Sequence, residues 1–235
     1  MASEDFLDKK LKHPSSSTDN SDINRMINTA IKNRHKVYLM GDWHLYKRIE
    51  KGKPACKEHQ PAFNHIIANI RKDIGVDDVF IYMGDVVDGE FQEKDKLKRI
   101  LRGIPLPQNS IMVRGNNDTF DKSFYIACGF KYVVDQFIWG DIIFTHIPVK
   151  NNNSMNIHSH LHSFHRYRIP YTNQIDVAYL GGREKPVELQ DVINTQKSYS
   201  KIIIEEPEYF DEHYIAMNIF HEAFHVHMIE DPFDD

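Results

Sequence analysis

The sequence predicts an α/β fold of mixed layers rather than a purely parallel sheet. In the first half of the chain, short apolar segments alternate with segments whose apolar residues recur at helical spacing. Later, two apolar segments follow each other across Gly140 and Asp141, which predicts a hairpin. The chain has 235 residues, long enough for one domain with a substantial core.

The individual elements follow from these patterns in chain order. After a polar, Ser-rich start, an amphipathic helix is expected with Ser21 as its N-cap. Its apolar stripe, which we expect to pack on the domain or on a second subunit, consists of Ile23, Met26, Ile27, Ala30 and Ile31. Further helices are expected at 61–75 and 91–101, and strands at 36–40, 79–83, 110–113, 132–140 and 141–146.

Composition excludes several classes of protein. The net charge of −5 gives no general reason to bind nucleic acid or anionic lipid. No apolar run approaches the ~18 residues of a membrane span, and the first residues lack the apolar core of a secretory signal. Cys56 and Cys128 form no disulfide framework, so we expect reduced thiols and a cytoplasmic protein.

Polar side chains collect just beyond the ends of the predicted strands. Asp42 and His44, then Asp85, Asn116 and His146, each follow an apolar segment. Sites in open α/β sheets form at the carboxyl ends of strands, so these groups should converge. Carboxylate, imidazole and amide ligands suit Mn, Fe, Zn, Ni or Mg, and the absence of thiolates argues against structural zinc. Two such ions, bridged by a carboxylate, could clamp a phosphoryl group.

Five blocks in this order carry a family resemblance: GDWH at 41–44, GDVVDG at 84–89, GNND at 115–118, TH at 145–146 and HSHLH at 158–162. The chain resembles the calcineurin-like metallophosphoesterases, particularly their small single-domain members. The resemblance implies a four-layer α/β/β/α sandwich of two mixed sheets flanked by helices. It covers residues 35–195, which leaves an N-terminal extension (1–34) and a C-terminal extension of unknown role (196–235).

The resemblance also implies a dinuclear centre, with manganese favoured and Fe, Zn, Ni or Mg also open. One ion would be held by Asp42, His44 and His162, the other by Asn116, His146 and His160, with Asp85 bridging both. A hydroxide shared by the ions would attack phosphorus, and Asp88 would orient the ligands.

The chain departs from this family at two of the blocks. The third block normally reads Gly-Asn-His-Asp or Gly-Asn-His-Glu, where the His protonates the leaving group and the acidic residue, here Asp118, orients it. Asn117 replaces that His and cannot donate a proton as imidazolium can. We therefore expect a preference for diesters or good leaving groups, unless His158, His165 or water supplies the proton.

The last block normally reads Gly-His-x-His, and here Ser159 takes the place of the glycine, where a positive φ would cost energy. A register that uses His158 and His160 as the ligands stays open. Arg114 could contact phosphate or could be a surface residue at a strand end.

Several functional alternatives remain open. The chain could be a catalytically weak or inactive scaffold for protein interaction. HEAFH at 221–225 matches the zinc-protease pattern H-E-x-x-H, but the region also fits a strand without a third ligand. Asp88-Gly89-Glu90 replaces the Asp-Arg-Gly of protein phosphatases, which favours small-molecule or nucleotide-type substrates. The sequence does not determine the natural substrate or the oligomeric state.

Overall fold

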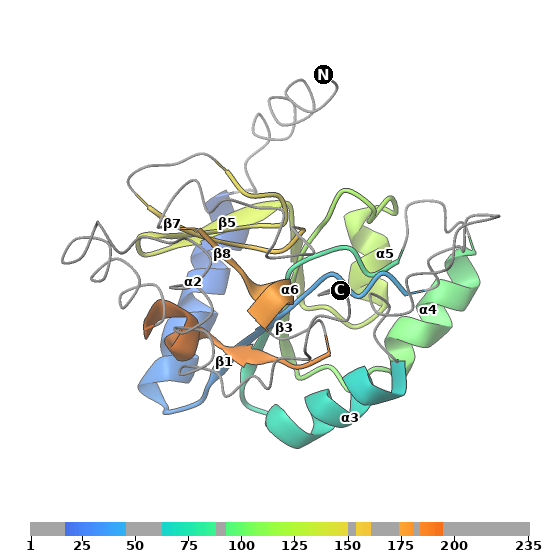
Figure 1. The fold of residues 1–235 in the computed structure, drawn as a ribbon, viewed down its shortest axis with the longest axis horizontal. Coiled ribbons are helices and arrows are strands. Elements are labelled where there is room, and N and C mark those ends of the chain that lie inside the picture. The colour runs from blue at the N-terminus through green and yellow to red at the C-terminus, as the bar shows by residue number, and fades with distance from the viewer. Residues whose placement is uncertain are drawn as a thin grey trace, which may run out of the picture.

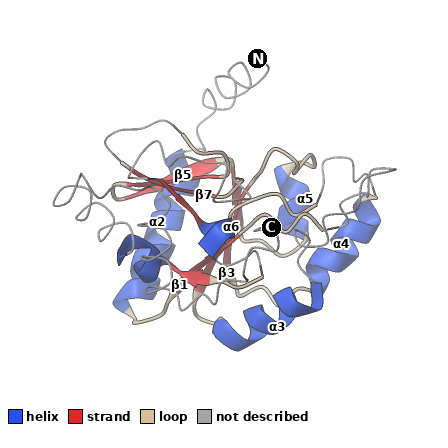
Figure 2. Ribbon diagram, viewed as in Figure 1, coloured by secondary structure: helices blue, strands red, loops and turns tan. Residues whose placement is uncertain are grey.

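The computed structural model describes residues 17–45, 63–87, 93–149, 154–160, 174–180 and 184–194. Two mixed sheets flanked by helices form the fold, as predicted (Figures 1 and 2). The helices include α2 (Ser17–Lys32), α3 (Phe63–Asp73), α4 (Lys94–Gly103), α5 (Lys122–Ala127) and α6 (Val177–Leu180), and residues 189–194 are also helical. The strands are β1 (Val37–Met40), β2 (Val79–Tyr82), β3 (Asn109–Val113), β4 (Tyr132–Val134), β5 (Gln136–Trp139), β6 (Ile142–Thr145), β7 (Met155–His158), β8 (Gln174–Asp176) and β9 (Val187–Glu188).

The first sheet has the strand order β4-β3-β2-β1-β9. Strands β1 to β4 are parallel, and β9 pairs antiparallel with β1. Every residue of β1 and β2 is buried, as expected of apolar strands covered on both faces. Because the four parallel strands run the same way, their carboxyl ends lie along one edge of the sheet.

The second sheet has the order β5-β6-β7-β8 and is also mixed. The predicted hairpin is confirmed, with β5 and β6 antiparallel and Gly140 at positive φ in the turn. The prediction of one continuous strand over 132–140 is wrong, because β4 belongs to the first sheet and β5 to the second. The break falls at Asp135, a bend between the two strands, and its carboxylate pairs with Arg114 and Lys122.

Helix α2 is part of the domain core. It begins before Ser21, which therefore lies inside the helix and is not its N-cap. Its residues Ile23 and Ile27 are fully buried in a cluster that contains side chains of both sheets. Asn20 accepts a hydrogen bond from the Ile138 backbone N–H of β5, which ties the helix to the edge of the second sheet.

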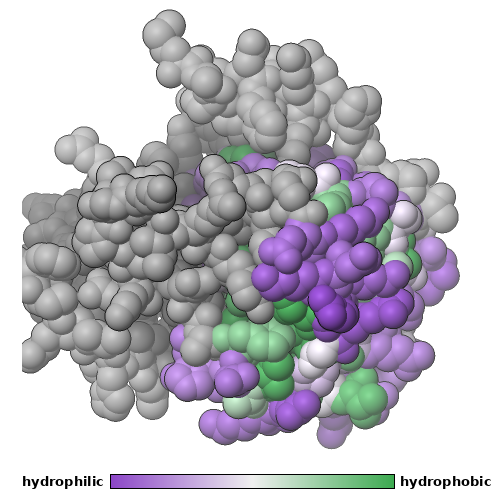
Figure 3. All heavy atoms as spheres, turned by 90° about the vertical axis from the view of Figure 1, so that its right-hand side faces the viewer, coloured by the Kyte–Doolittle hydropathy of each residue, from purple (hydrophilic) through white to green (hydrophobic). Residues whose placement is uncertain are grey.

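Helices α3, α4 and α5 pack against the first sheet in a second apolar cluster. On the side of the molecule that carries α4, the described residues form a mostly hydrophilic surface with a smaller hydrophobic area (Figure 3). This agrees with α4 itself, which buries Leu97 and Leu101 and exposes charged residues. Within the described ranges, no helix has the length and apolar character needed to cross a membrane.

Candidate metal centre

The loops that follow β1 and β2 lie side by side at the carboxyl edge of the first sheet. The Asp42 N–H donates to the Gly84 carbonyl over 2.8 Å, and the His44 N–H donates to the Asp85 carbonyl over 3.0 Å. These bonds continue the strand pairing beyond β1 and β2 and bring three candidate ligands together. All three are at most 5% exposed.

Backbone strain is concentrated in the candidate ligands. Asp42, His44, Asp85 and His160 have φ values of 57°, 43°, 56° and 112°, and Arg34 is the other non-glycine residue with positive φ in the described part of the chain. Such conformations cost about 1–3 kcal/mol each and persist where the surroundings enforce them, typically at functional sites. The positive φ of the last block lies at His160 and not at Ser159, so the expected cost to the serine does not arise.

Two glycines permit the close approach of the ligand loops. A Cβ at Gly115 would lie 1.9 Å from Asp85 Oδ1, and a Cβ at Gly84 would lie 2.7 Å from His146 Nδ1. Gly84 also has a φ of +93°, which a side chain would disfavour. Each glycine is therefore required by a ligand that occupies the space beside it.

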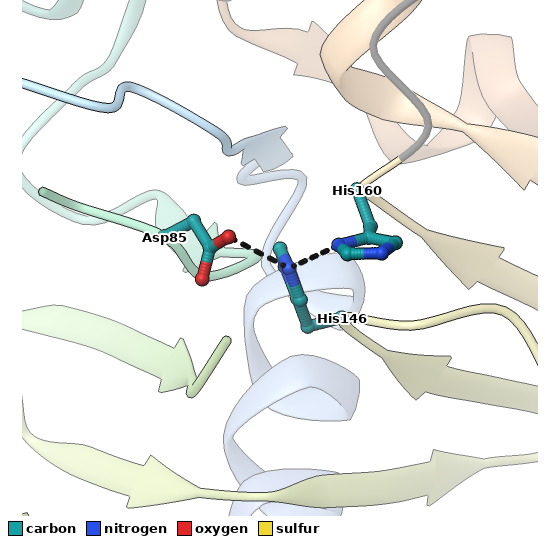
Figure 4. A group of neighbouring side chains, drawn as sticks. All are labelled: Asp85, His146 and His160. Carbon is teal, nitrogen blue, oxygen red and sulfur yellow. Dashed lines mark hydrogen bonds and ion pairs between the residues drawn. The ribbon is translucent and has the colours of Figure 1, made fainter. Parts of the chain in front are cut away.

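One cluster of ligand atoms surrounds His146 (Figure 4). Its Nε2 lies 3.2 Å from Asp85 Oδ2, 3.1 Å from Asn116 Oδ1 and 3.1 Å from His160 Nδ1. Its Nδ1 lies 2.7 Å from the Met83 carbonyl oxygen, which can only accept, so Nδ1 carries the proton. When Nε2 is deprotonated, as metal binding requires, its lone pair is therefore directed toward the other ligand atoms.

This arrangement suits a cation. A carboxylate oxygen, an amide oxygen and imidazole lone pairs converge within hydrogen-bond distance, and they repel one another unless positive charge lies between them. Burial lowers the pKa of His146, but the hydrogen bond and charge of Asp85 outweigh burial and raise it to about 9. In the metal-free protein a proton on His146 supplies the charge that a bound ion would otherwise bring.

A second cluster consists of Asp42, His44 and Asp85. His44 Nε2 lies 3.3 Å from Asp42 Oδ1 and 3.6 Å from Asp85 Oδ2. The same Asp85 oxygen is thus close to the imidazole of His44 in this cluster and to that of His146 in the other. One carboxylate shared by two sets of ligands fits a pair of adjacent ions.

Comparison with known proteins agrees with this geometry. The family model for calcineurin-like phosphoesterase matches residues 35–226. The chain belongs to the calcineurin-like phosphoesterase family. Members of this family are hydrolases that use divalent metal ions to act on phosphoester bonds, and the predicted family membership is confirmed.

Other comparisons add little. No curated protein matches the chain. A crystal structure of a protein of unknown function from Aquifex aeolicus is similar, with 18% sequence identity and a TM-score of 0.45. The match covers 68% of this chain and 98% of that one. A similarity of this size does not extend to function.

This phosphoesterase brings Asn117 against the shared carboxylate. The Asn117 backbone N–H donates to Asp85 Oδ1 over 2.9 Å, and its side-chain amide donates to Asp85 Oδ2 over 2.7 Å. The neighbouring Asn116 directs its amide oxygen to His146. The two consecutive asparagines therefore serve different members of the site.

Asp118 binds the backbone of the ligand loops. Its carboxylate accepts hydrogen bonds from the N–H groups of Asp85, Val86 and Gly115 at 2.8, 3.1 and 2.7 Å. The side chain is 4% exposed, and burial together with the charge of Asp85 raises its pKa. With no imidazole at 117 to orient, the carboxylate fixes the turn that presents the shared ligand.

The other expected site residues lie in different surroundings. Arg114 donates to Asp135 Oδ1 through Nε at 3.0 Å and Nη2 at 2.6 Å, and also to the Phe120 carbonyl. His158 lies in β7 and is 2% exposed, and burial lowers its pKa to about 3. Asp88, His162, His165 and the segment 221–225 lie outside the described residues.

Two buried hydroxyls near the site were not expected from the sequence. Ser159 Oγ donates to Asp42 Oδ2 over 2.5 Å. Tyr82 accepts a hydrogen bond from the Trp43 backbone N–H over 3.3 Å beneath the ligand loop. The only signals were a serine in place of a glycine and a tyrosine in an otherwise non-polar buried segment.

Proposed function

We propose that the chain is a phosphodiesterase that hydrolyses a small-molecule or nucleotide-type phosphodiester with two divalent metal ions, manganese being favoured. The observation that carries the proposal is the position of Asp85 between the two ligand clusters. A shared carboxylate flanked by imidazoles is the arrangement that two adjacent ions require. The reduced cysteines expected from the sequence are in keeping with a cytoplasmic location.

Different sets of residues would bind the two proposed ions. Asp42 and His44 would hold one ion together with His162, and Asn116, His146 and His160 would hold the other. Asp85 would contact both ions, and Asp88 would orient ligands as in the family pattern. When bound, the two ions lower the pKa of water and neutralise charge that develops on the phosphoryl group.

The binding residues support this role through their fixed orientation. The Met83 carbonyl fixes the tautomer of His146, and the three backbone N–H groups held by Asp118 fix the turn around Asp85. Preorganised ligands of this kind need little rearrangement when ions and substrate bind.

The preference for diesters follows from Asn117. Its amide is hydrogen-bonded to Asp85 and cannot protonate a leaving oxygen at neutral pH. A missing general acid costs about 10²–10⁴-fold, and most where the leaving group is a poor one. We therefore place the natural substrate among phosphodiesters whose leaving oxygen departs without that proton, or receives it from water or from His165. His158 is unsuited to supply it, because it is buried and burial lowers its pKa to about 3. Arg114 would reach a phosphate only after exchanging its contact with Asp135.

One experiment tests this proposal. The metal content of the purified protein is counted, and hydrolysis of a nitrophenyl phosphodiester and of the matching monoester is compared with added manganese. Asp85→Asn serves as the blank, and Asp141→Asn, an exposed aspartate in the β5–β6 turn, serves as the matched control. We expect two ions per chain and faster diester turnover in the wild type and in the control, and neither in the blank.

Two outcomes would contradict the proposal. If two ions bind and neither ester is hydrolysed, the chain is a metal-binding scaffold that has lost turnover. If turnover survives in Asp85→Asn, the activity does not arise at this site.

A further inference from the structure

We propose that Ser159 is a positioning residue whose hydroxyl orients the Asp42 carboxylate, so that the other carboxylate oxygen faces the metal position shared with His44. The inference rests on the proposed function, because it assigns a role within the same metal centre. It concerns a residue at which this chain departs from the Gly-His-x-His pattern that it otherwise resembles.

The hydrogen bonds around Asp42 hold one of its two oxygens. Ser159 Oγ donates to Asp42 Oδ2 over 2.5 Å, and the His160 backbone N–H donates to the same oxygen. Asp42 Oδ1 lies 3.3 Å from His44 Nε2, on the side of the candidate ion. A carboxylate with two donors on one oxygen cannot rotate without breaking both bonds, so the other oxygen keeps its direction.

The position of Ser159 in the fold gives this bond a second consequence. Ser159 follows β7 of the second sheet, and its backbone N–H donates to the His146 carbonyl over 3.1 Å. Asp42 follows β1 of the first sheet. The hydroxyl therefore connects a candidate ligand of one cluster to the segment that carries His160 of the other, and this segment is itself hydrogen-bonded to the His146 backbone.

The packing around Ser159 is specific to a small side chain. Asp42 and Ser159 are both 0% exposed, so no solvent competes for the bond. A Cβ at Gly41 would lie 2.7 Å from Ser159 Oγ, 3.2 Å from Ser159 Cβ and 2.9 Å from Met83 Cβ. The missing side chain at Gly41 thus provides the space that the serine occupies.

The expected effect of removing the hydroxyl follows from this geometry. Hydrogen bonds that orient metal ligands typically contribute about 10–100-fold to metal affinity. In Ser159→Ala and Ser159→Gly, Asp42 keeps the His160 N–H but loses the second donor. We expect the ion held by Asp42 and His44 to bind about 10–100-fold more weakly in both variants, and the ion held by His146 to be less affected.

The test uses the full chain and manganese alone. Metal-free protein is titrated with Mn²⁺, bound ions are counted, and electron paramagnetic resonance distinguishes a coupled pair from a single ion. The matched control is Ser110→Ala, another fully buried serine, whose Oγ donates to the Gly129 carbonyl over 3.2 Å at the far end of β3. Thermal melting of every metal-free variant shows whether it folds.

The proposal predicts a coupled pair in the wild type and in Ser110→Ala, and a single-ion signal at limiting manganese in both Ser159 variants. A general weakening of the fold would lower the affinity of both ions together and would overturn the proposal. Equal affinity in Ser159→Ala and wild type would overturn it too, as would tighter binding in Ser159→Gly. If the wild type itself binds no manganese, the proposed function and the role of Ser159 are both wrong. If the wild type binds a coupled pair and the Ser159 variants bind it equally well, only the role of Ser159 is wrong.

Discussion

Asn117 contacts both oxygens of Asp85, one through its backbone N–H at 2.9 Å and the other through its side-chain amide at 2.7 Å. The residue at the position of the expected general acid therefore holds the carboxylate that is shared by the two candidate ligand clusters. This contact gives the amide a role that a simple loss of histidine would not predict. It also makes substitutions at 117 informative about both proton transfer and ligand orientation.

Restoring a histidine at position 117 should change which substrates are hydrolysed. In Asn117→His we expect kcat/KM for diesters with alkyl leaving groups to rise, by at most about 10²–10⁴-fold, because imidazolium can protonate the departing oxygen. Nitrophenyl diesters should gain little, since their leaving group departs without a proton. The measurement is kcat/KM across a series of diesters that differ in the basicity of the leaving group.

Asn117→Ala is the matched control for this substitution, because it removes the amide without adding an acid. This variant should bind manganese more weakly, because Asp85 loses the hydrogen bond from the Asn117 side chain. The way in which kcat/KM depends on the basicity of the leaving group should stay as in the wild type. An equal gain for alkyl and nitrophenyl diesters in Asn117→His would speak against a missing general acid.

Gly115 should be intolerant of any side chain. A Cβ there would lie 1.9 Å from Asp85 Oδ1 and 2.6 Å from the Asp85 backbone nitrogen. In Gly115→Ala we expect Asp85 to be displaced and both ions to be lost, as judged by metal analysis of the purified variant.

Gly103→Ala is the comparison for this glycine substitution. Nothing lies within 4 Å of a Cβ at Gly103, which is the last residue of α4. This variant should bind metal as the wild type does, and its free energy of unfolding should rise by up to about 1 kcal/mol, since alanine favours helix. Normal metal content in Gly115→Ala would show that the ligand loops are less tightly packed than described.

Much of the fold, and the convergence of several candidate ligands at one site, could be predicted from local patterns. Buried strands ending in Asp or His were recognisable because apolar runs and strand ends are local features of sequence. The change of sheet at Asp135 was not, because it depends on which strands pair: β4 pairs with β3 of the first sheet, and β5 pairs with β6 of the second. Only Asp135 and Gln136 interrupt the apolar segment 132–140, and two polar residues do not by themselves indicate a change of sheet.

The role of the residues around the ligands was harder to predict. Asp118 was expected to orient a general acid, but its carboxylate binds three backbone N–H groups. The Ser159 hydroxyl was expected to be only a strained substitute for glycine, because its partner Asp42 is 117 positions away. Hydrogen bonds between loops that are distant in sequence depend on how those loops are placed in the folded protein, and residue spacing does not give this placement.

The Arg114–Asp135 pair should make stability depend on pH in the acid range. Burial alone would raise the pKa of Asp135, but the hydrogen bond and charge of Arg114, with the charge of Lys122, lower it. A carboxyl with a depressed folded-state pKa contributes stability above its unfolded pKa of about 3.9 and loses it as pH falls through the folded value.

Asp135→Asn should therefore lower the free energy of unfolding by about 1–3 kcal/mol at pH 7, and the difference from wild type should shrink as pH falls below about 4. Urea unfolding of the metal-free proteins between pH 7 and pH 3 measures it. The exposed Asp77→Asn provides the control, and its difference from wild type should be small at each pH. A pH-independent difference for Asp135→Asn would assign its cost to packing rather than to charge.

Helix α2 should contribute strongly to the stability of the domain, although it precedes the segment matched by the family model. Ile27 is 0% exposed in the core shared by both sheets, and Ile31 of the same helix is 47% exposed. Ile27→Ala should lower the free energy of unfolding by about 2–5 kcal/mol, because it leaves a cavity in that core. Ile31→Ala should change it by less than about 0.5 kcal/mol. Equal effects in urea unfolding would mean that α2 is not held against the two sheets, whereas a large difference would make residues 17–32 an integral part of the folded domain.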